Sequence, residues 1–133
     1  MNQVHPTAVV GPGVELGDDN IVGPYAVIYG PTVIGDRNWI GPHVVIGTPG
    51  DSRGNAHPPL WDAPGSGQPI VIGNDNIFHE FATIHASVYD QTRVGSDCFL
   101  MDKAHVSHDV HLGDRVTLTS SVMLGGHCHI GDG

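Results

Sequence analysis

The sequence predicts an all-β protein, a parallel β-helix made of hexapeptide repeats. Aliphatic residues recur every six positions, a usually small residue follows four positions later, and a turn rich in Gly, Pro, Asp and Asn closes each hexad. Nineteen glycines and ten prolines also disfavour helices. In the first part of the chain the repeat runs without an insertion through Val4, Val10, Leu16, Val22, Ile28, Ile34, Ile40 and Ile46.

Each hexad predicts a short strand with two inward side chains, followed by a tight turn. Three hexads, 18 residues, would close one triangular coil, and stacked coils would form three parallel sheets with strands about 4.8 Å apart. The chain of 133 residues then makes about six coils in one domain, residues 1–133. The later repeat positions are Ile72, Phe78, Ile84, Val94, Leu100, Val106, Leu112, Leu118, Leu124 and Ile130.

The repeat is interrupted twice. A segment from about residue 48 to 69, rich in Gly and Pro, predicts an external loop, and four extra residues separate Ile84 from Val94. Counting the three faces places both insertions at one corner, which also carries His108 and His127. A disordered linker is the alternative for the loop, but Leu60 and Trp61 favour an ordered, functional excursion. The loop is expected to cover the cleft of its own or a neighbouring subunit and to shield Trp61.

Composition limits the partners and the location. The net charge of −9, with only five Lys and Arg, disfavours binding to nucleic acid or to anionic membranes. No apolar run approaches a membrane span, and the first residues do not resemble a signal peptide, so a cytoplasmic location is expected. Cys98 and Cys128 fall at inward positions on different faces, which predicts buried free thiols rather than a disulfide.

The candidate site is the stretch Ala104–Asp109, which places two histidines and a carboxylate in one turn. Because one coil takes 18 residues, His108 should lie directly beneath Gly126, and His127 above Asp109. With the four extra residues absorbed at the corner, the outward histidines would gather within about 10 Å of one another. This predicted cluster contains His85, His105, His108 and His127.

The chemistry of this corner suits acyl transfer. A neutral imidazole can accept a proton at physiological pH, so His108 is the expected general base, and Asp109 can fix its tautomer. Gly125 and Gly126 have no side chains, so their backbone N–H groups should be exposed directly above His108 and could stabilise an oxyanion. The remaining histidines are expected to be ordinary surface residues: His5, His43, His57, His79, His111 and His129.

Two other functions stay open. Histidine clusters bind zinc, and trimeric β-helices with interfacial zinc occur in the gamma-class carbonic anhydrases. That family pairs two histidines five residues apart, a spacing absent from this sequence, so no metal site is expected. The second alternative is a non-catalytic structural or binding module.

The segment MDKAHVSHDVHLGDR, preceded by VGSD and followed by LGGH, resembles the active-site stretch of the bacterial UDP-N-acetylglucosamine O-acyltransferases that begin lipid A synthesis. The segments VHPTAVVGPGVELG, IGTPGDSR and IGNDNIFHEFATIH extend the resemblance over nearly the whole chain. The resemblance implies a left-handed β-helix, an exception to the usual right-handed crossover, assembled as a homotrimer. It also implies transfer of an acyl group from acyl carrier protein to a sugar hydroxyl, with no cofactor beyond this co-substrate.

Residue roles follow from the same resemblance. It implies that His108 is the general base and that Gly126 is the oxyanion donor. Asp51 and Arg53 match an acidic and a basic position of the family's loop motif, and are expected to bind substrate. The histidines expected to line the cleft between subunits are His85, His105 and His127.

The sequence also departs from the family. It ends at Gly133, partway through a coil, and is expected to be a short form without the further coils and helical domain of family members. Ala86 stands where a basic residue is expected after His85. Coenzyme A thioesters therefore join acyl carrier protein as possible donors, with a sugar nucleotide such as UDP-N-acetylglucosamine as the acceptor. Open strand edges in the last coil and the exposed face above it favour the homotrimer.

Overall fold

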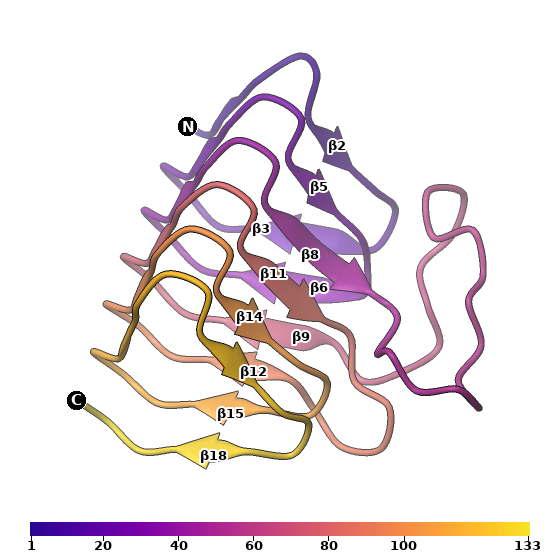
Figure 1. Cartoon of the computed structure of the whole chain (residues 1–133). Helices are drawn as coiled ribbons and strands as arrows, with labels where there is room; N and C mark the ends of the chain where they lie inside the picture. The colour runs from indigo at the N-terminus through magenta and orange to yellow at the C-terminus, as the bar shows by residue number, and fades with distance from the viewer.

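The computed structural model describes all 133 residues as a triangular prism of 18 short strands, with a single long loop outside it (Figure 1). The strands form three six-stranded sheets in which every pair is parallel, and successive strands belong to successive sheets. This confirms the predicted six-coil β-helix. The chain contains no helix that is long and apolar enough to cross a bilayer.

Each sheet takes one strand from each coil. Sheet 1 contains β1 (Gln3–Val4), β4 (Ile21–Val22), β7 (Trp39–Ile40), β10 (Ile77–Phe78), β13 (Phe99–Leu100) and β16 (Thr117–Leu118). Sheet 2 contains β2 (Val9–Val10), β5 (Val27–Ile28), β8 (Val45–Thr48), β11 (Thr83–His85), β14 (His105–Val106) and β17 (Met123–Leu124). Sheet 3 contains β3 (Val14–Leu16), β6 (Thr32–Ile34), β9 (Ile70–Ile72), β12 (Arg93–Val94), β15 (His111–Leu112) and β18 (His129–Ile130).

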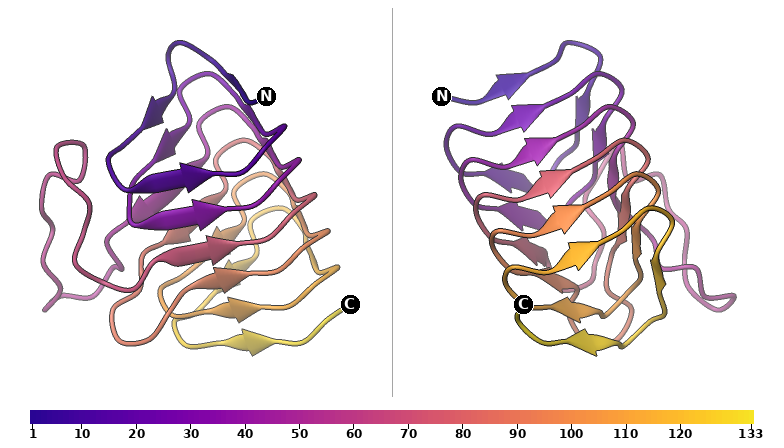
Figure 2. Two further views of the ribbon diagram at one scale, coloured as in Figure 1. Left: turned by 180° about the vertical axis from the view of Figure 1, so that it is seen from behind. Right: turned by 60° about the vertical axis from the view of Figure 1, so that its left-hand side comes forward.

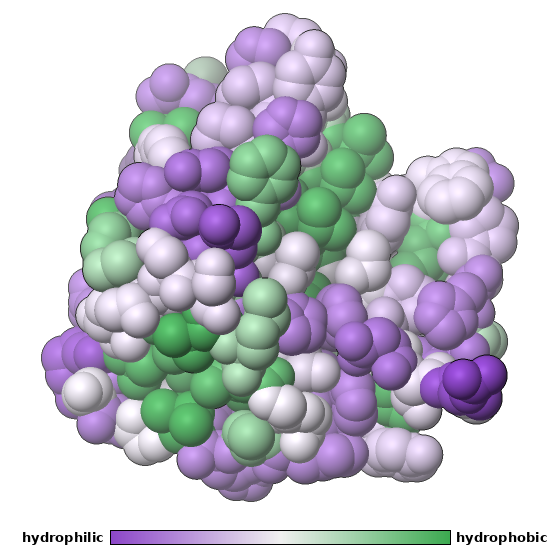
Figure 3. Space-filling view, viewed as in Figure 1, coloured by the Kyte–Doolittle hydropathy of each residue, from purple (hydrophilic) through white to green (hydrophobic).

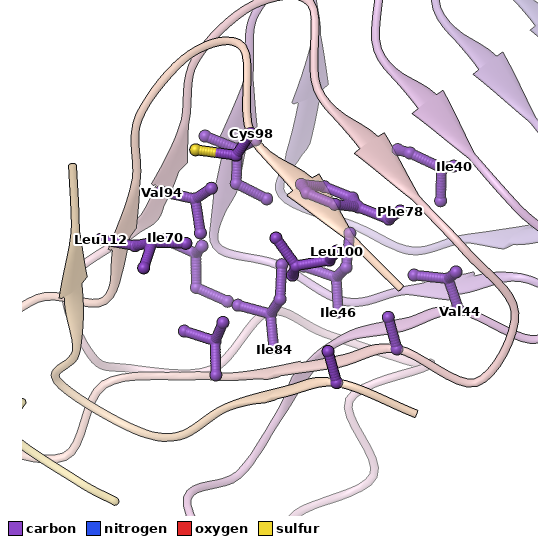
Figure 4. Close-up of a cluster of buried hydrophobic side chains, with 14 of the residues drawn as sticks. Ile40, Val44, Ile46, Ile70, Phe78, Ile84, Val94, Cys98, Leu100 and Leu112 are labelled. Atoms are coloured by element: carbon purple, nitrogen blue, oxygen red, sulfur yellow. The ribbon is translucent and has the colours of Figure 1, made fainter. Parts of the chain in front are cut away.

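The core is a column of aliphatic side chains inside the prism. The repeat positions point inward from all three sheets and pack together, with Phe78 as the largest fully buried side chain (Figure 4). Each hexad adds two inward side chains, its aliphatic residue and the residue four positions later, such as Ala26 or Ala104. Cys98 is buried among them and Cys128 is half-buried, and both are free thiols, as predicted.

Buried asparagines connect the coils at the corner before sheet 1. The side-chain amide of Asn38 donates to the carbonyl of Gly73, and its Oδ1 accepts from the backbone N–H of Asn76. Its own backbone N–H donates to Oδ1 of Asn20 in the coil before. Buried backbone groups need partners, and at a turn they cannot all find them in the sheet. The small polar residues of the repeat are therefore structural.

Replacing Asn38 with alanine should lower stability strongly. The change leaves a buried carbonyl and a buried N–H without partners, and each such group costs about 1–3 kcal/mol. Urea unfolding of Asn38→Ala is expected to show a loss of about 3 kcal/mol in the free energy of unfolding. The matched control is Asn2→Ala, at the partly exposed end of the same ladder, where Asn2 makes equivalent bonds to Gly17 and Asn20. An equal loss in both variants would contradict this account.

Both insertions leave from the corner between sheets 2 and 3, as the face count predicted. The long loop, residues 49–69, joins β8 to β9, and residues 86–92 join β11 to β12 (Figures 1 and 2). The long loop packs beside the earlier coils, where the N–H of Gly65 donates to the carbonyl of Gly30 and Leu60 is 4% exposed. Trp61 is 61% exposed within this chain, so its expected shielding would require a neighbouring subunit. Leu60 is the loop side chain that is buried.

Candidate functional site

The stacking of β11, β14 and β17 in sheet 2 creates the candidate site. Thr83 pairs with His105 and His105 with Met123, so positions 18 residues apart, or 22 across the second insertion, lie on adjacent strands. The chain leaves these strands at one corner and carries the histidines with it. Figure 3 shows hydrophobic surface over the upper coils of this face, whereas hydrophilic and hydrophobic residues are mixed over the lower coils.

The four predicted histidines meet at this corner in two edge-to-face pairs. The ring centroids of His85 and His105 are 4.4 Å apart, and those of His108 and His127 are 5.2 Å apart. The side chain of His108 is 15% exposed, whereas that of His127 is 53% exposed. His108 is thus largely enclosed yet still reachable from solvent, and His127 stands at the rim.

Gly126 lies directly above the His108 ring, as the 18-residue spacing predicts. A Cβ atom at Gly126 would come within 2.7 Å of His108 Nε2 and 2.6 Å of its Cε1, so no larger residue fits without moving the ring. The N–H of His127 donates to the carbonyl of His108, whereas the N–H of Gly126 makes no hydrogen bond within the chain. An unused backbone donor therefore lies beside the imidazole.

Asp109 orients His108. Its Oδ2 lies 2.9 Å from His108 Nδ1, and a carboxylate only accepts hydrogen bonds, so Nδ1 carries the proton and Nε2 is free to accept one. Burial alone would raise the pKa of Asp109, but the hydrogen bonds from His108 and from the N–H groups of Asp90, Tyr89 and Val88 outweigh it and hold that pKa below its usual value. The side chain is charged at neutral pH.

Asp109 has a second role that the sequence did not suggest. Three successive N–H groups of the insertion at residues 86–92 converge on its carboxylate, and its own N–H donates to Oγ1 of Thr92. The residue has a positive φ of 63°, the corner conformation that His127 shares one coil later. One carboxylate thus orients the candidate base and anchors the shorter insertion.

His85 and His105 lie deeper in the same cleft. Burial lowers the pKa of His85, and the nearby His105 lowers it further, while Asp51 opposes the change. Burial also lowers the pKa of His105, whose Nδ1 lies 2.6 Å from Oγ1 of Thr83. Both rings are therefore neutral at physiological pH and can donate or accept hydrogen bonds to a bound ligand.

A bulge interrupts the pairing of β8 and β11 at the start of the long loop. His85 pairs with Thr48 rather than with Gly47, so the register of β8 and β11 shifts by one residue. Gly47 has a φ of 100°, and a Cβ there would come within 3 Å of the Tyr29 backbone, which restricts the position to glycine.

The start of the long loop covers one side of His108. A Cβ at Gly50 would lie 2.8 Å from that of His108 and 2.7 Å from Cγ2 of Val88, so the loop backbone rests directly on both side chains. Oδ1 of Asp51 lies 3.5 Å from Nδ1 of His85, although the two are not aligned for a hydrogen bond. Arg53 is exposed and forms no ion pair, so the structure brings Asp51 into the cluster but leaves Arg53 outside it.

Tyr89 is a site residue that sequence analysis missed. It belongs to the shorter insertion, and its ring stacks on His127 with centroids 5.8 Å apart and an interplanar angle of 28°. The ring is 79% exposed and therefore offers an open aromatic face at the rim of the cleft. The position of the four extra residues was the available signal, but which of them faces the cleft depends on the fold of the insertion.

Two groups at the corner have the composition of metal sites. Asp51, His85 and His105 form one, and His108, Asp109 and His127 form the other, with ligand atoms within 4.8 Å of one another in each. In the second group the Asp109 carboxylate already accepts bonds from three backbone amides and from His108. This arrangement suits orientation of a base better than coordination of a metal.

The stability of the protein should fall as the pH is lowered from 7 to 5. The pKa of His85 is lowered in the folded state, so the unfolded chain, with a His pKa near 6.5, binds more protons in this range. Its contribution to stability is complete above pH 6.5 and is lost as the pH falls towards the folded pKa. Urea unfolding of His85→Gln at pH 5, 6 and 7 should show a shallower slope than wild type. The same substitution at His57, on the loop surface, is the control, and an unchanged slope in His85→Gln would refute the prediction.

The chain is similar in sequence to several named proteins along most of its length. No protein-family model matches the chain. A Leptothrix cholodnii protein named acyl-[acyl-carrier-protein]–UDP-N-acetylglucosamine O-acyltransferase is 44% identical over 97% of this chain and 54% of its own length. A protein of the same name from Syntrophobacter fumaroxidans is 37% identical over 93% of this chain and 53% of its own length.

The structural comparison gives the same answer. The crystal structure of UDP-N-acetylglucosamine O-acyltransferase from Moraxella catarrhalis matches 97% of this chain and 55% of its own, with a TM-score of 0.71 and 29% identity. The chain spans about half the length of the curated relatives that it matches. Over nearly its whole length, the chain is thus related to the UDP-N-acetylglucosamine O-acyltransferases and shares their left-handed β-helix.

Proposed function

We propose that this protein transfers an acyl group from a thioester, on acyl carrier protein or coenzyme A, to a hydroxyl group of a sugar nucleotide such as UDP-N-acetylglucosamine. The observation that carries the proposal is the arrangement around His108. Asp109 holds the ring with Nε2 free, and the unused N–H of Gly126 lies beside that ring. The relatives, whose names specify this acyl transfer, support the choice of donor and acceptor.

In the proposed reaction, Nε2 of His108 accepts the proton of the acceptor hydroxyl as its oxygen attacks the thioester carbonyl. The N–H of Gly126 donates a hydrogen bond to the oxyanion that forms, and the charged Asp109 stabilises the imidazolium. The intermediate then collapses, the C–S bond breaks, and the thiolate takes the proton from His108. The products are an ester and a free thiol.

The other cluster residues are proposed to bind the substrates. His85 and His105 are neutral and half-buried, so they can hydrogen-bond to sugar hydroxyls without adding charge to the cleft. His127 stands at the rim, where the acyl chain or the nucleotide would enter. Asp51 faces His85 from the loop, and Arg53 is free to reach an anionic group such as a phosphate of the nucleotide.

We propose that the protein is a homotrimer with its sites between subunits. The outer face of sheet 2 exposes apolar side chains at both ends, with Val9 40% exposed in the first coil and Met123 65% exposed in the last coil, next to the strand that carries His105. An apolar face of this kind suits contact with a second copy. Multi-angle light scattering at micromolar concentration is expected to give three times the chain mass of 14.0 kDa. A stable monomer would contradict both the trimer and a shared site.

The function can be tested by following thiol release and product mass. The purified chain is mixed with acyl carrier protein or coenzyme A thioesters of several chain lengths and with a panel of sugar-nucleotide and amine acceptors. Acylated UDP-N-acetylglucosamine is the expected product. Failure to acylate any acceptor would favour a binding module, and transfer only to amines would correct the acceptor class.

The cytoplasmic location stays a prediction from the sequence.

A further inference from the structure

A second group of histidines lies on the outer face of sheet 3, away from the His108 ring. His111 in β15 and His129 in β18 pair in register on adjacent strands, and their rings stack with centroids 4.2 Å apart at an angle of 18°. Asp90, from the insertion at residues 86–92, places Oδ2 3.1 Å from Nε2 of His111. The ligand atoms of these three residues, the sheet 3 cluster, lie within 4.8 Å of one another.

The sheet 3 cluster contains an unsatisfied polar atom. Nε2 of His111 is buried and has no hydrogen-bond partner, even though the Asp90 carboxylate is close, because the two groups are not aligned for a hydrogen bond. Buried polar atoms in folded proteins nearly always have a partner. An imidazole nitrogen and a carboxylate oxygen that approach each other without bonding can both be satisfied by a cation bound to the two.

We propose that Asp90, His111 and His129 bind a divalent transition metal of the Zn²⁺ type. Imidazole nitrogen and carboxylate oxygen bind zinc at about 2.0–2.2 Å, so neighbouring ligands in a tetrahedral site stand about 3.3 Å apart. The 3.1 Å between Asp90 and His111 already matches this separation. Only His129, which is exposed at the last coil, has to turn its ring towards the other two.

The charges around the sheet 3 cluster allow a cation. The chain carries a net charge of −9, which raises the local concentration of cations. The nearest permanent positive charge in the same column is Arg93, the strand partner of His111. Nε of Arg93 donates a 2.7 Å hydrogen bond to Gln91, so the guanidinium is already engaged with the insertion. Removing this charge with Arg93→Gln should therefore tighten metal binding.

The metal would connect three parts of the fold. It would join the insertion through Asp90 to the fifth coil through His111 and to the last strand through His129. The same insertion is held from the other side by the Asp109 carboxylate, which accepts the N–H groups of Val88, Tyr89 and Asp90. A metal here would stabilise the terminal coil and restrain the segment that carries Tyr89. The site was not expected from the sequence, which placed both of its histidines among ordinary surface residues.

The test uses the whole chain and Zn²⁺ alone. Equilibrium dialysis followed by metal analysis is expected to show one bound Zn²⁺ per chain fewer in the double variant His111→Ala/His129→Ala than in wild type. Co²⁺ in place of Zn²⁺ should give visible absorption bands in wild type that the double variant lacks. Zn²⁺ should raise the Tm of wild type by binding the folded state and leave the Tm of the double variant nearly unchanged.

Two further variants separate the sheet 3 cluster from the catalytic corner. His105→Ala is expected to keep the Zn²⁺ bound at the sheet 3 cluster and the Co²⁺ absorption bands, because His105 belongs to the group with Asp51 and His85 at the catalytic corner. Asp90→Asn preserves the size of the side chain and should weaken metal binding by more than about tenfold. Residues that only hydrogen-bond to a metal ligand already contribute about tenfold or more to metal affinity, and Asp90 is proposed as a direct ligand. If the double variant does not fold, His129→Ala at the exposed end replaces it with the same expectation. Equal metal content and equal spectra in wild type and the sheet 3 variants would overturn the proposal, as would loss of the metal in His105→Ala alone.

Discussion

His108→Ala is expected to lose about 10²–10⁴ of the turnover rate while the protein stays folded and keeps its assembly. In the proposed mechanism this imidazole takes the acceptor proton at Nε2, because Nδ1 lies 2.9 Å from the Asp109 carboxylate. The side chain lies at a corner outside the aliphatic column, so its removal leaves the core intact. The measurement is thiol release under saturating donor and acceptor, with circular dichroism and light scattering on the same samples.

The control for this experiment is His43→Ala. His43 lies at the corner between sheets 1 and 2, where its ring stacks between Tyr25 and Phe81, away from the cluster. Its removal should leave the turnover rate within about twofold of wild type, because a general base contributes only where it reaches the reacting proton. Equal rates in wild type and His108→Ala would remove His108 from the mechanism. Equal losses in both variants would point to a general loss of structure.

Gly126→Ala is expected to reduce kcat by about 10²–10³, the loss typical when one oxyanion donor is misplaced. The new Cβ would come within 2.6 Å of Cε1 of His108, so either the ring or the Gly126 backbone has to move. Movement of the ring weakens its bond to Asp109, and movement of the backbone displaces the N–H donor. The measurement is kcat and KM for the best donor and acceptor pair.

The adjacent glycine provides a matched control. A Cβ at Gly125 would meet no atom within 4 Å, so Gly125→Ala adds the same methyl group one residue earlier without a clash. It should retain a kcat close to that of wild type. If both variants lose activity to the same degree, the close approach of Gly126 to His108 does not explain the loss. If neither variant loses activity, Gly126 does not act as the oxyanion donor.

Much of the fold followed from local rules. Six-residue periodicity, strand formers at the inward positions and turn formers at the corners were enough to predict the three sheets, their register and the corner from which both insertions leave. The stacking of Gly126 above His108 followed from the same arithmetic. In a β-helix the contact partners of a residue are set by a constant spacing along the chain, so neighbours in space can be counted directly.

The insertions did not obey this rule, and there only the tertiary structure decided. The repeat could not show that the chain itself buries Leu60 and leaves Trp61 exposed, or that Tyr89 stacks on His127. A segment outside the repeat has no constant spacing, so its side chains are placed by packing against whichever coil it meets.

Asp109 and the sheet 3 cluster show the same division. The sequence by itself determined that Asp109 would adjoin His108, because the two are consecutive at a corner whose conformation recurs at His127 one coil later. That this carboxylate also anchors three N–H groups of the insertion, and that the insertion carries Asp90 to His111, depends on the path of residues 86–92. Periodic backbone geometry determined the contact between Asp109 and His108. The packing of the non-repeating residues 86–92 against the prism determined their contacts with Asp109 and His111.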